Sequence, residues 1–366
     1  MMFWLMLILV GGLIGLFGLW GILKSRHMDI WIASYIRTRK LRQSNARHKH
    51  IYVCLADHYE PYFNNVTQEV ARGLVDNWVE QYRKVASQFS DSNGRPPQHS
   101  YFYPEEEYDE YVLQQIQKIC EDGFGDVDIH LHHDNDTAEN LEKTLNGFKQ
   151  LLNEKHNLLR RNEKGELIYG FIHGNWALDN SRPDGRWCGV NNEIEVLQKT
   201  GCVYDMTMPS APSDTQTKTI NQIYWAEEKG HCKSHDTGER AKVGKWYQDK
   251  LLMIQGPLML NWKNRKFGVI PKIESSELSG DAPPGLSRVK LWEAANICVE
   301  GAEEHVFIKL HTHGLQPKNS QMFFERNGFF DLWSALDKSF KNKPEYTLHY
   351  VSAWEMYEKV KSLVEK

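Results

Sequence analysis

The chain has 366 residues, 41% of them hydrophobic and 12% aromatic, which is ample for one large core or two smaller ones. Its formal net charge is −4, and residues 51–366 are more acidic than the whole, which argues against nucleic acid as a partner. Six widely spaced cysteines without a Cys-x-x-Cys pair argue against a disulfide framework or a zinc knot.

The N-terminal segment is apolar and uncharged over residues 1–23. This run is long enough to cross a hydrocarbon layer of about 30 Å, and it lacks the basic start and small-x-small site of a cleaved signal peptide. Residues 1–24 are therefore expected to form an uncleaved, single-pass membrane anchor. Residues 25–49 form a basic juxtamembrane segment, whose 28–36 stretch is expected along the lipid headgroups. This charge bias predicts a cytoplasmic body, with an exported body as the alternative.

From residue 50 onward, short apolar runs alternate with longer amphipathic ones. The strand-like runs are 50–56, 100–103, 127–131, 167–173, 202–206, 304–310 and 346–351. The helical patterns are 66–89, 108–120, a stretch from 137 onward, 190–199, 320–340 and 353–364. Strand–helix units in series predict an α/β fold with a parallel sheet, and polar strand ends favour a closed (β/α) barrel over an open sheet. Residues 212–284 break the rhythm and predict a β-rich insertion over the barrel rim.

The strand at 127–131 runs into a cluster of imidazoles and carboxylates, His132-His133-Asp134-Asn135-Asp136. Histidine and aspartate together suit zinc, manganese, iron or cobalt. His132 and Asp136 are four residues apart, so both face one ion if a helix starts after the strand. Together with His58 they form the expected set of metal ligands, and His133 and Asp134 are the alternative ligands. A polar loop with hydrogen-bonded histidines is the alternative.

Other strand ends carry similar residues, and in a parallel barrel these side chains converge on one mouth. They are Asp57, His58 and Tyr59 after the first strand, His173, Asn175 and Trp176 after the fourth, Asp205 after the fifth, and His311 and His313 near the end of the sixth. A helix cap at 57–58 and a tight turn at 173–176 are the purely structural alternatives.

These motifs, in this order along residues 50–360, resemble the polysaccharide deacetylase family, carbohydrate esterase family 4, within the glycoside hydrolase/deacetylase barrel superfamily. The motifs are Asp57-His58, then His132-x-x-x-Asp136, then the strand ending at His173, then His311-Thr-His313. The resemblance implies a distorted (β/α)7 barrel over residues 50–366. It also implies that Asp57 is the base, that His58, His132 and Asp136 bind the metal, and that His311 or His313 is the acid.

The expected reaction is metal-dependent removal of an acetyl group from an N-acetylated, or less favourably O-acetylated, polysaccharide or glycan precursor. A divalent ion, zinc first, then manganese, cobalt or iron, polarises the acyl oxygen and lowers the pKa of its water. Tyr59, His173, Asn175, Trp176 and Asp205 are expected to contact the glycan. The expected partners are the glycan, the membrane through the N-terminal helix, and polysaccharide-synthesis machinery.

Two other functions remain open. A glycoside hydrolase on the same barrel would use two carboxylates, such as Asp57 and Asp205, without a metal. A membrane-anchored glycan-binding or assembly protein would keep the pocket but not the catalysis. Bound metal distinguishes the deacetylase from the first alternative, and acetate release distinguishes it from the second.

Overall fold

The computed structural model describes residues 17, 18, 20–44 and 46–366. The strands are β1 (Lys49–His58), β2 (His99–Pro104), β3 (Gly125–Leu131), β4 (Arg160–Arg161), β5 (Leu167–His173), β6 (Cys202–Asp205), β7 (Ile223–Ala226), β8 (Glu239–Arg240), β9 (Leu251–Ile254), β10 (Met259–Lys266), β11 (Ile270–Glu274), β12 (His305–Thr312) and β13 (Tyr346–Tyr350). The helices are α2 (Met28–Arg37), α3 (Gln68–Ala86), α4 (Glu110–Glu121), α5 (Ala138–His156), α6 (Glu193–Lys199), α7 (Leu286–Ala295), α8 (Pro317–Phe324), α9 (Gly328–Phe340) and α10 (Ala353–Val364).

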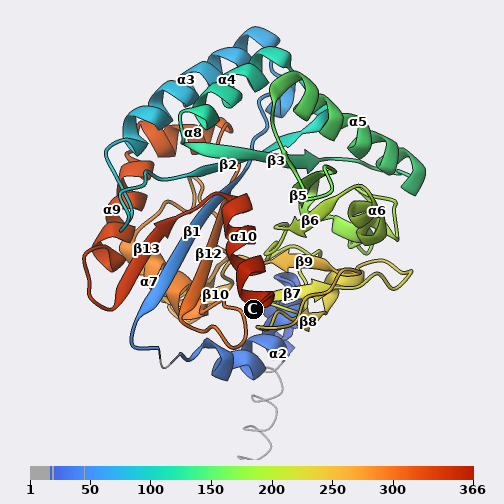
Figure 1. Cartoon of the computed structure of the whole chain (residues 1–366). Helices are drawn as coiled ribbons and strands as arrows, with labels where there is room; N and C mark the ends of the chain where they lie inside the picture. The colour runs from blue at the N-terminus through green and yellow to red at the C-terminus, as the bar shows by residue number, and fades with distance from the viewer. Residues whose placement is uncertain (1–16, 19, 45) are drawn as a thin grey trace, which may run out of the picture.

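One large sheet organises the molecule (Figure 1). Seven strands follow one another in the order β12-β1-β2-β3-β5-β6-β9, and every neighbouring pair is parallel. β13 pairs with the first half of β1, and β2 pairs with its second half. β7 runs antiparallel to β9 and carries β8 at the far edge. The prediction of an α/β fold on a large parallel sheet is confirmed, and the sheet is barrel-like.

The two faces of β1 show how the sheet is packed. Ile51, Val53 and Leu55 belong to the core shared with the surrounding helices. The alternate residues of the strand point inward, because successive strand side chains point to opposite faces. Cys54 and Ala56 lie in this inner core, to which α10 also contributes side chains. In Figure 1, α10 crosses in front of β1 and β12.

Helix α3 illustrates why the outer layer forms where it does. The Thr67 side chain caps its first turn by accepting a hydrogen bond from the backbone N–H of Val70. Val75, Trp78 and Tyr82 then recur at helical spacing and are buried against the sheet. The single helix predicted at 320–340 is wrong in one respect, because the structure divides this stretch into two helices, α8 and α9.

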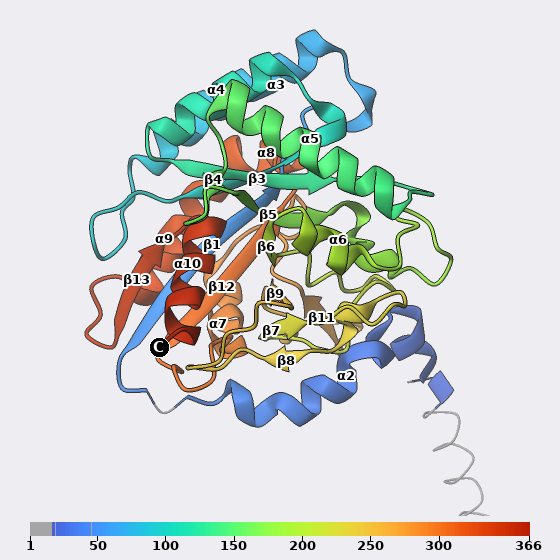
Figure 2. The ribbon, with the colours of Figure 1, turned by 45° about the vertical axis from the view of Figure 1, so that its right-hand side comes forward.

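The region predicted as a β-rich insertion does contain β7 to β11, but it is not detached from the sheet. β9 extends the parallel path beside β6, and only β10 and β11 form a hairpin of their own. Helix α2 packs beside this region (Figure 2), where Met28 and Trp31 are buried with Leu258 and Ile273. The 28–36 segment expected along lipid headgroups therefore packs against protein.

The structure contradicts the prediction of a single-pass membrane anchor. Within residues 17, 18, 20–44 and 46–366, no helix has both the length and the apolar character needed to cross a membrane. Residues 1–16 and 19 of the predicted span lie outside the described residues. The assignment of a single-pass membrane protein with a cytoplasmic body is therefore withdrawn.

Candidate functional site

Five side chains gather at the inner side of the sheet, where the parallel strands end. We call this set the mouth cluster: His58 and Glu60 at the end of β1, His130 and His132 at the end of β3, and His313 after β12. They fall into two overlapping groups, His58–Glu60–His313 and Glu60–His130–His132, and in each group the donor atoms lie within 4.8 Å of one another. Glu60 belongs to both groups and is therefore the centre of the cluster.

The Glu60 carboxylate faces three imidazoles. Its Oε1 lies 3.4 Å from Nε2 of His130, 3.5 Å from Nε2 of His132 and 3.8 Å from Nε2 of His313. Only 6% of Glu60 is exposed, and burial raises the pKa of its carboxyl group. One buried carboxylate among imidazole nitrogens is a donor set that suits a divalent transition metal.

The hydrogen bonds of His130 fix which ring nitrogen points into the cluster. Its Nδ1 lies 2.7 Å from the carbonyl oxygen of Ile172, which can only accept, so Nδ1 carries the proton. Nε2 then presents a lone pair toward Glu60 and has no hydrogen-bond partner among the described residues. Burial lowers the pKa of His130 to about 3, so the ring is neutral. A cation between the lone pair and the carboxylate would satisfy both.

His58 is a second buried imidazole with an unused nitrogen. Only 2% of the residue is exposed, and its Nδ1 finds no partner in the described part of the chain. Its ring lies 4.4 Å from that of His313 and 4.7 Å from that of His130. Burial and then the neighbouring imidazoles hold its pKa well below the usual value. These unsatisfied, neutral imidazoles fit a metal ion.

His132 differs from its neighbours because it has a carboxylate partner. Its Nδ1 lies 2.5 Å from Oε1 of Glu106, which also accepts the backbone N–H of His132 at 3.1 Å. Burial alone would lower the pKa of His132, but the hydrogen bond and charge of Glu106, together with the charges of Glu60 and Glu107, outweigh it and the pKa is raised. Nε2 is thereby turned toward Glu60 and the open side of the site.

Above the mouth cluster lies an open pocket of about 550 Å³. Glu60, His132 and His313 form part of its wall, so the cluster is reached from solvent through this pocket. Its other walls combine aromatic and amide side chains: Tyr62, Phe63, Trp176, Asn64, Asn65, Asn175, Gln316 and Asn319. Glu107 also lines it, and burial raises the pKa of that carboxyl to about 7.

Asp57, expected as the base, lies on the other side of β1. Its Oδ2 accepts from Nε2 of His99 at 2.9 Å, and its Oδ1 accepts from the backbone N–H of Gly314 at 2.7 Å. Asp57 and His99 are both fully buried beside Trp78, on the face that packs against helices. The period-2 alternation of β1 turns His58 inward, and it therefore turns Asp57 outward.

The expected ligand set is divided in the same way. His58 and His132 lie in the mouth cluster, but Asp136 does not: its Oδ2 is 3.1 Å from Nδ1 of His133, which belongs to a separate group of metal-type residues. Asp134 accepts from the backbone N–H of Trp187. Consecutive residues His132 and His133 thus serve different sites.

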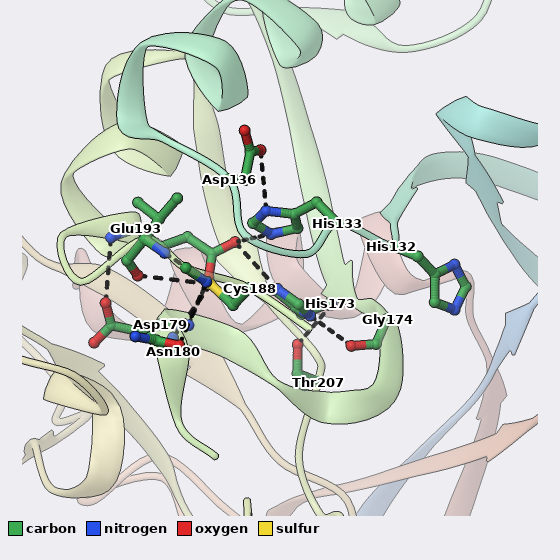
Figure 3. Close-up of polar contacts among 12 residues, drawn as sticks. His132, His133, Asp136, His173, Gly174, Asp179, Asn180, Cys188, Glu193 and Thr207 are labelled. Carbon is green, nitrogen blue, oxygen red and sulfur yellow. Dashed lines mark hydrogen bonds and ion pairs between the residues drawn. The ribbon is translucent and has the colours of Figure 1, made fainter. Parts of the chain in front are cut away.

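That second group, which we call the outer cluster, consists of His133, His173, Cys188 and Glu193, with donor atoms within 4.8 Å of one another. Figure 3 shows His133 and His173 directed at Glu193, while His132 points away from them. Burial alone would raise the pKa of Glu193, but His173 and then His133 hold it at about 2. His173, expected to bind substrate, therefore belongs to this cluster instead.

The remaining predicted site residues are placed as follows. His311 is buried on the inner side, with its ring 6.5 Å from that of His58, but His313 and not His311 belongs to a metal-type group. Tyr59 is fully buried against Trp78 and Tyr101. Asp205 accepts two hydrogen bonds from Thr207, and burial raises its pKa to about 7. Asn175 and Trp176 line the pocket, and their contact with a glycan stays a prediction.

Sequence reasoning missed Glu60, His130, Glu106, Cys188 and Glu193. Two of them carried a readable signal: Glu60 lies two residues after His58, and His130 lies two residues before His132. Strand side chains two apart share a face, so either pair could have been extended by the same rule. The other three come from loops or helix ends, where sequence spacing carries no such rule.

No protein-family model matches the chain, and no curated protein sequence matches it. Among solved structures, it is similar to an α-mannosidase from Enterococcus faecalis V583, with a TM-score of 0.44 and 10% identity over 86% of this chain and 30% of that chain. It is also similar to a 4-α-glucanotransferase from Thermococcus litoralis, with a TM-score of 0.43 and 8% identity over 86% of this chain and 40% of that chain. The chain spans less than half the length of either protein.

Proposed function

We propose that the chain is a metal-dependent hydrolase that removes an acetyl group from a saccharide bound in the mouth pocket. The observation that carries the proposal is the Glu60 carboxylate, which lies 3.4 to 3.8 Å from three imidazole Nε2 atoms at the base of an open pocket. His58, Glu60 and His313 would hold the ion, with His130 beside them. A bound divalent ion supplies polarisation of an acyl oxygen and a water of lowered pKa.

His132 is the residue best placed to move a proton. Its Nδ1 is held by Glu106 and its Nε2 faces the pocket, the arrangement of an oriented acid–base imidazole. In the charged state that Glu106 favours, His132 would donate a proton to the leaving nitrogen or oxygen. It takes the part that the family resemblance gave to His311 or His313.

The saccharide is proposed from the chemistry of the pocket wall. Tyr62, Phe63 and Trp176 offer apolar faces for the C–H surface of a sugar ring. Asn175 and Asn319 offer amide donors and acceptors for its hydroxyls. The resemblance of the strand-end motifs to polysaccharide deacetylases points to the same substrate class.

The test combines metal analysis with acetate release from N-acetylglucosamine oligosaccharides. His58→Ala should lose both the mouth metal and turnover. His132→Ala should keep the metal and lose about 10²–10⁴-fold in rate. His231→Ala, a change at an exposed histidine, is the control and should alter neither. A wild-type protein that binds no metal at the mouth, or that binds metal and glycan without releasing acetate, would refute the proposal and favour a glycan-binding protein.

A second candidate is glycoside hydrolysis by two carboxyl groups, which Glu60 and Glu107 favour because both line the pocket. Asp57 and Asp205, the pair suggested by the sequence, do not line it. Cleavage of glycosidic bonds that survives complete removal of metal would support this candidate over the deacetylase.

A further inference from the structure

The outer cluster is separated from the mouth by the strand ends themselves. His132 and His133 are consecutive and point to opposite sides (Figure 3), and the space beside Gly174 is occupied by the His132 ring. In the outer cluster, Glu193, Cys188 and His173 are fully buried, and 7% of the His133 side chain is exposed. This site therefore has its own donors, and all four are protected from solvent.

His173 supplies the observation that points to a ligand. Its Nδ1 lies 2.6 Å from the carbonyl oxygen of Gly174, which can only accept, so the proton is on Nδ1. Nε2 is then a bare lone pair, 3.5 Å from Oε1 of Glu193, and it has no hydrogen-bond partner within the described ranges. The carboxylate has the His133 ring as a partner, but the His173 lone pair has none among the residues described, and a cation between His173 and Glu193 would satisfy both.

His133 is oriented in the way that metal-binding histidines are. Its Nδ1 lies 3.1 Å from Oδ2 of Asp136, and its Nε2 lies 3.2 Å from Oε1 of Glu193. The Nδ1 contact with Asp136 is an ion-pair distance without hydrogen-bond geometry among the described residues. A small rotation of the Asp136 carboxylate would make it a hydrogen bond, which would fix Nε2 as the ligand and make it more basic. Asp136, expected to bind a metal directly, is thereby a positioning residue for His133.

Cys188 and Glu193 complete a set of four donors. The Cys188 sulfur lies 3.4 Å from Oε2 of Glu193 and also accepts the backbone N–H of Asn180 at 3.3 Å. The backbone N–H of Asp179 donates to the same Oε2 at 2.5 Å, which leaves Oε1 directed at the two imidazoles. One thiol, two imidazoles and one carboxylate make up a set of four donors of the types that zinc prefers.

We propose that His133, His173, Cys188 and Glu193 form a closed, four-donor zinc site that is distinct from the mouth cluster. Binding displaces the thiol proton of Cys188 and the proton that His133 Nε2 shares with Glu193, and both are released to solvent, because the ligands are the thiolate and an unprotonated imidazole nitrogen. The donor atoms now span up to 4.8 Å, and side-chain movements of about 1 Å would bring them to the spacing set by zinc–ligand bonds of about 2.0–2.3 Å.

The site would fasten the wall of the mouth pocket. Its ligands come from the turn after β3, the end of β5, the loop before α6 and the first turn of α6. Asn175 and Trp176, which line the pocket, lie in the loop between His173 and Cys188. A metal that joins both ends of this loop restricts it, so zinc binding is expected to raise stability and to hold these two residues in place. This role does not depend on the reaction proposed for the mouth.

The test is cobalt substitution in the full chain after removal of bound metal. Wild type should develop thiolate-to-cobalt charge-transfer absorption equivalent to one site per chain, and zinc should compete it away. Cys188→Ala should lose this absorption, while Cys202→Ala, a change at another buried cysteine, should keep it. His58→Ala should also keep it, which separates this site from the mouth.

Thermal unfolding with added zinc gives a second readout if Cys188→Ala folds poorly. Zinc should raise the melting temperature of wild type and of His58→Ala, and the shift should vanish when Glu193→Gln is added to His58→Ala. The proposal is overturned if wild type shows no cobalt–thiolate absorption, if that absorption persists in Cys188→Ala, or if His58→Ala with Glu193→Gln keeps the zinc-dependent shift of His58→Ala.

Discussion

Replacing Asp57 by asparagine should destabilise the fold rather than act only on chemistry. Asp57 is fully buried and uses both oxygens, one toward Nε2 of His99 and one toward the backbone N–H of Gly314. Asparagine keeps the shape but offers one acceptor and one amide donor. Either the amide donor faces an N–H group, or His99 moves its proton to Nδ1, which is buried without a partner among the described residues. A lost charge-assisted hydrogen bond costs about 1.5–3 kcal/mol and an unsatisfied buried donor about 1–3 kcal/mol. We therefore expect the free energy of unfolding to fall by about 3–5 kcal/mol.

The assay is urea unfolding of the full chain, followed by tryptophan fluorescence, for wild type, Asp57→Asn and Glu60→Gln. Glu60→Gln is the matched control because it also neutralises a buried carboxyl group near the end of β1. It should change stability by about 1 kcal/mol or less, since it removes a charge without leaving a donor unpaired. If Asp57→Asn unfolds at the wild-type midpoint but abolishes turnover, the carboxylate belongs to the chemistry of the mouth and our reading of its position is wrong.

Three further outcomes are expected. The pKa of Glu193 is lowered from its ordinary value of 4.5 to about 2, so this carboxylate contributes stability that is present above pH 4.5 and is lost as the pH falls toward 2. Glu193→Gln should therefore flatten the pH dependence of the urea midpoint in that range. An unchanged slope would contradict this. Gly174→Ala would place a Cβ 2.2 Å from Cδ2 of His132 and displace that ring, so acetate release should fall while calorimetry shows the mouth metal retained, whereas Gly147→Ala, in open space on α5, should keep full turnover and gain up to about 1 kcal/mol of stability. Trp31→Ala should cost about 3–5 kcal/mol by thermal unfolding if α2 is an integral part of the fold, and a loss below about 1 kcal/mol would show that it is not.

Element positions were well determined by the apolar pattern. The strand expected at 167–173 and the helix expected at 353–364 have those bounds in the structure. The apolar pattern does not show which face of the sheet each residue occupies, because parallel strands that are covered on both faces have no polar face. Leu55 packs toward the helices and Ala56 toward the interior, and both are buried. The same ambiguity placed Asp57 in the predicted site.

The site was predictable only as a region. The residue types and the strand ends were identified, but the grouping of the histidines depends on where each strand stops and which way the next residue turns. His132 remains in line with the inner face of β3, whereas His133 turns outward to meet α6. Glu193 lies 60 residues beyond His133 in the chain, and no sequence spacing links the two.

The pairing of β1 has a consequence for how the chain is made. Its partners are β2, which is synthesised soon after it, and β12 and β13, which are synthesised near the other end of the sequence. Lys49 pairs with Tyr346, which lies about 300 residues later in the chain. At about 5–20 residues per second, synthesis of that stretch takes roughly 15–60 s, and one edge of β1 is unpaired during this time. Nascent chains stalled before β12 should therefore be bound by chaperones or aggregate, because an open hydrophobic strand edge pairs with whatever strand it meets first.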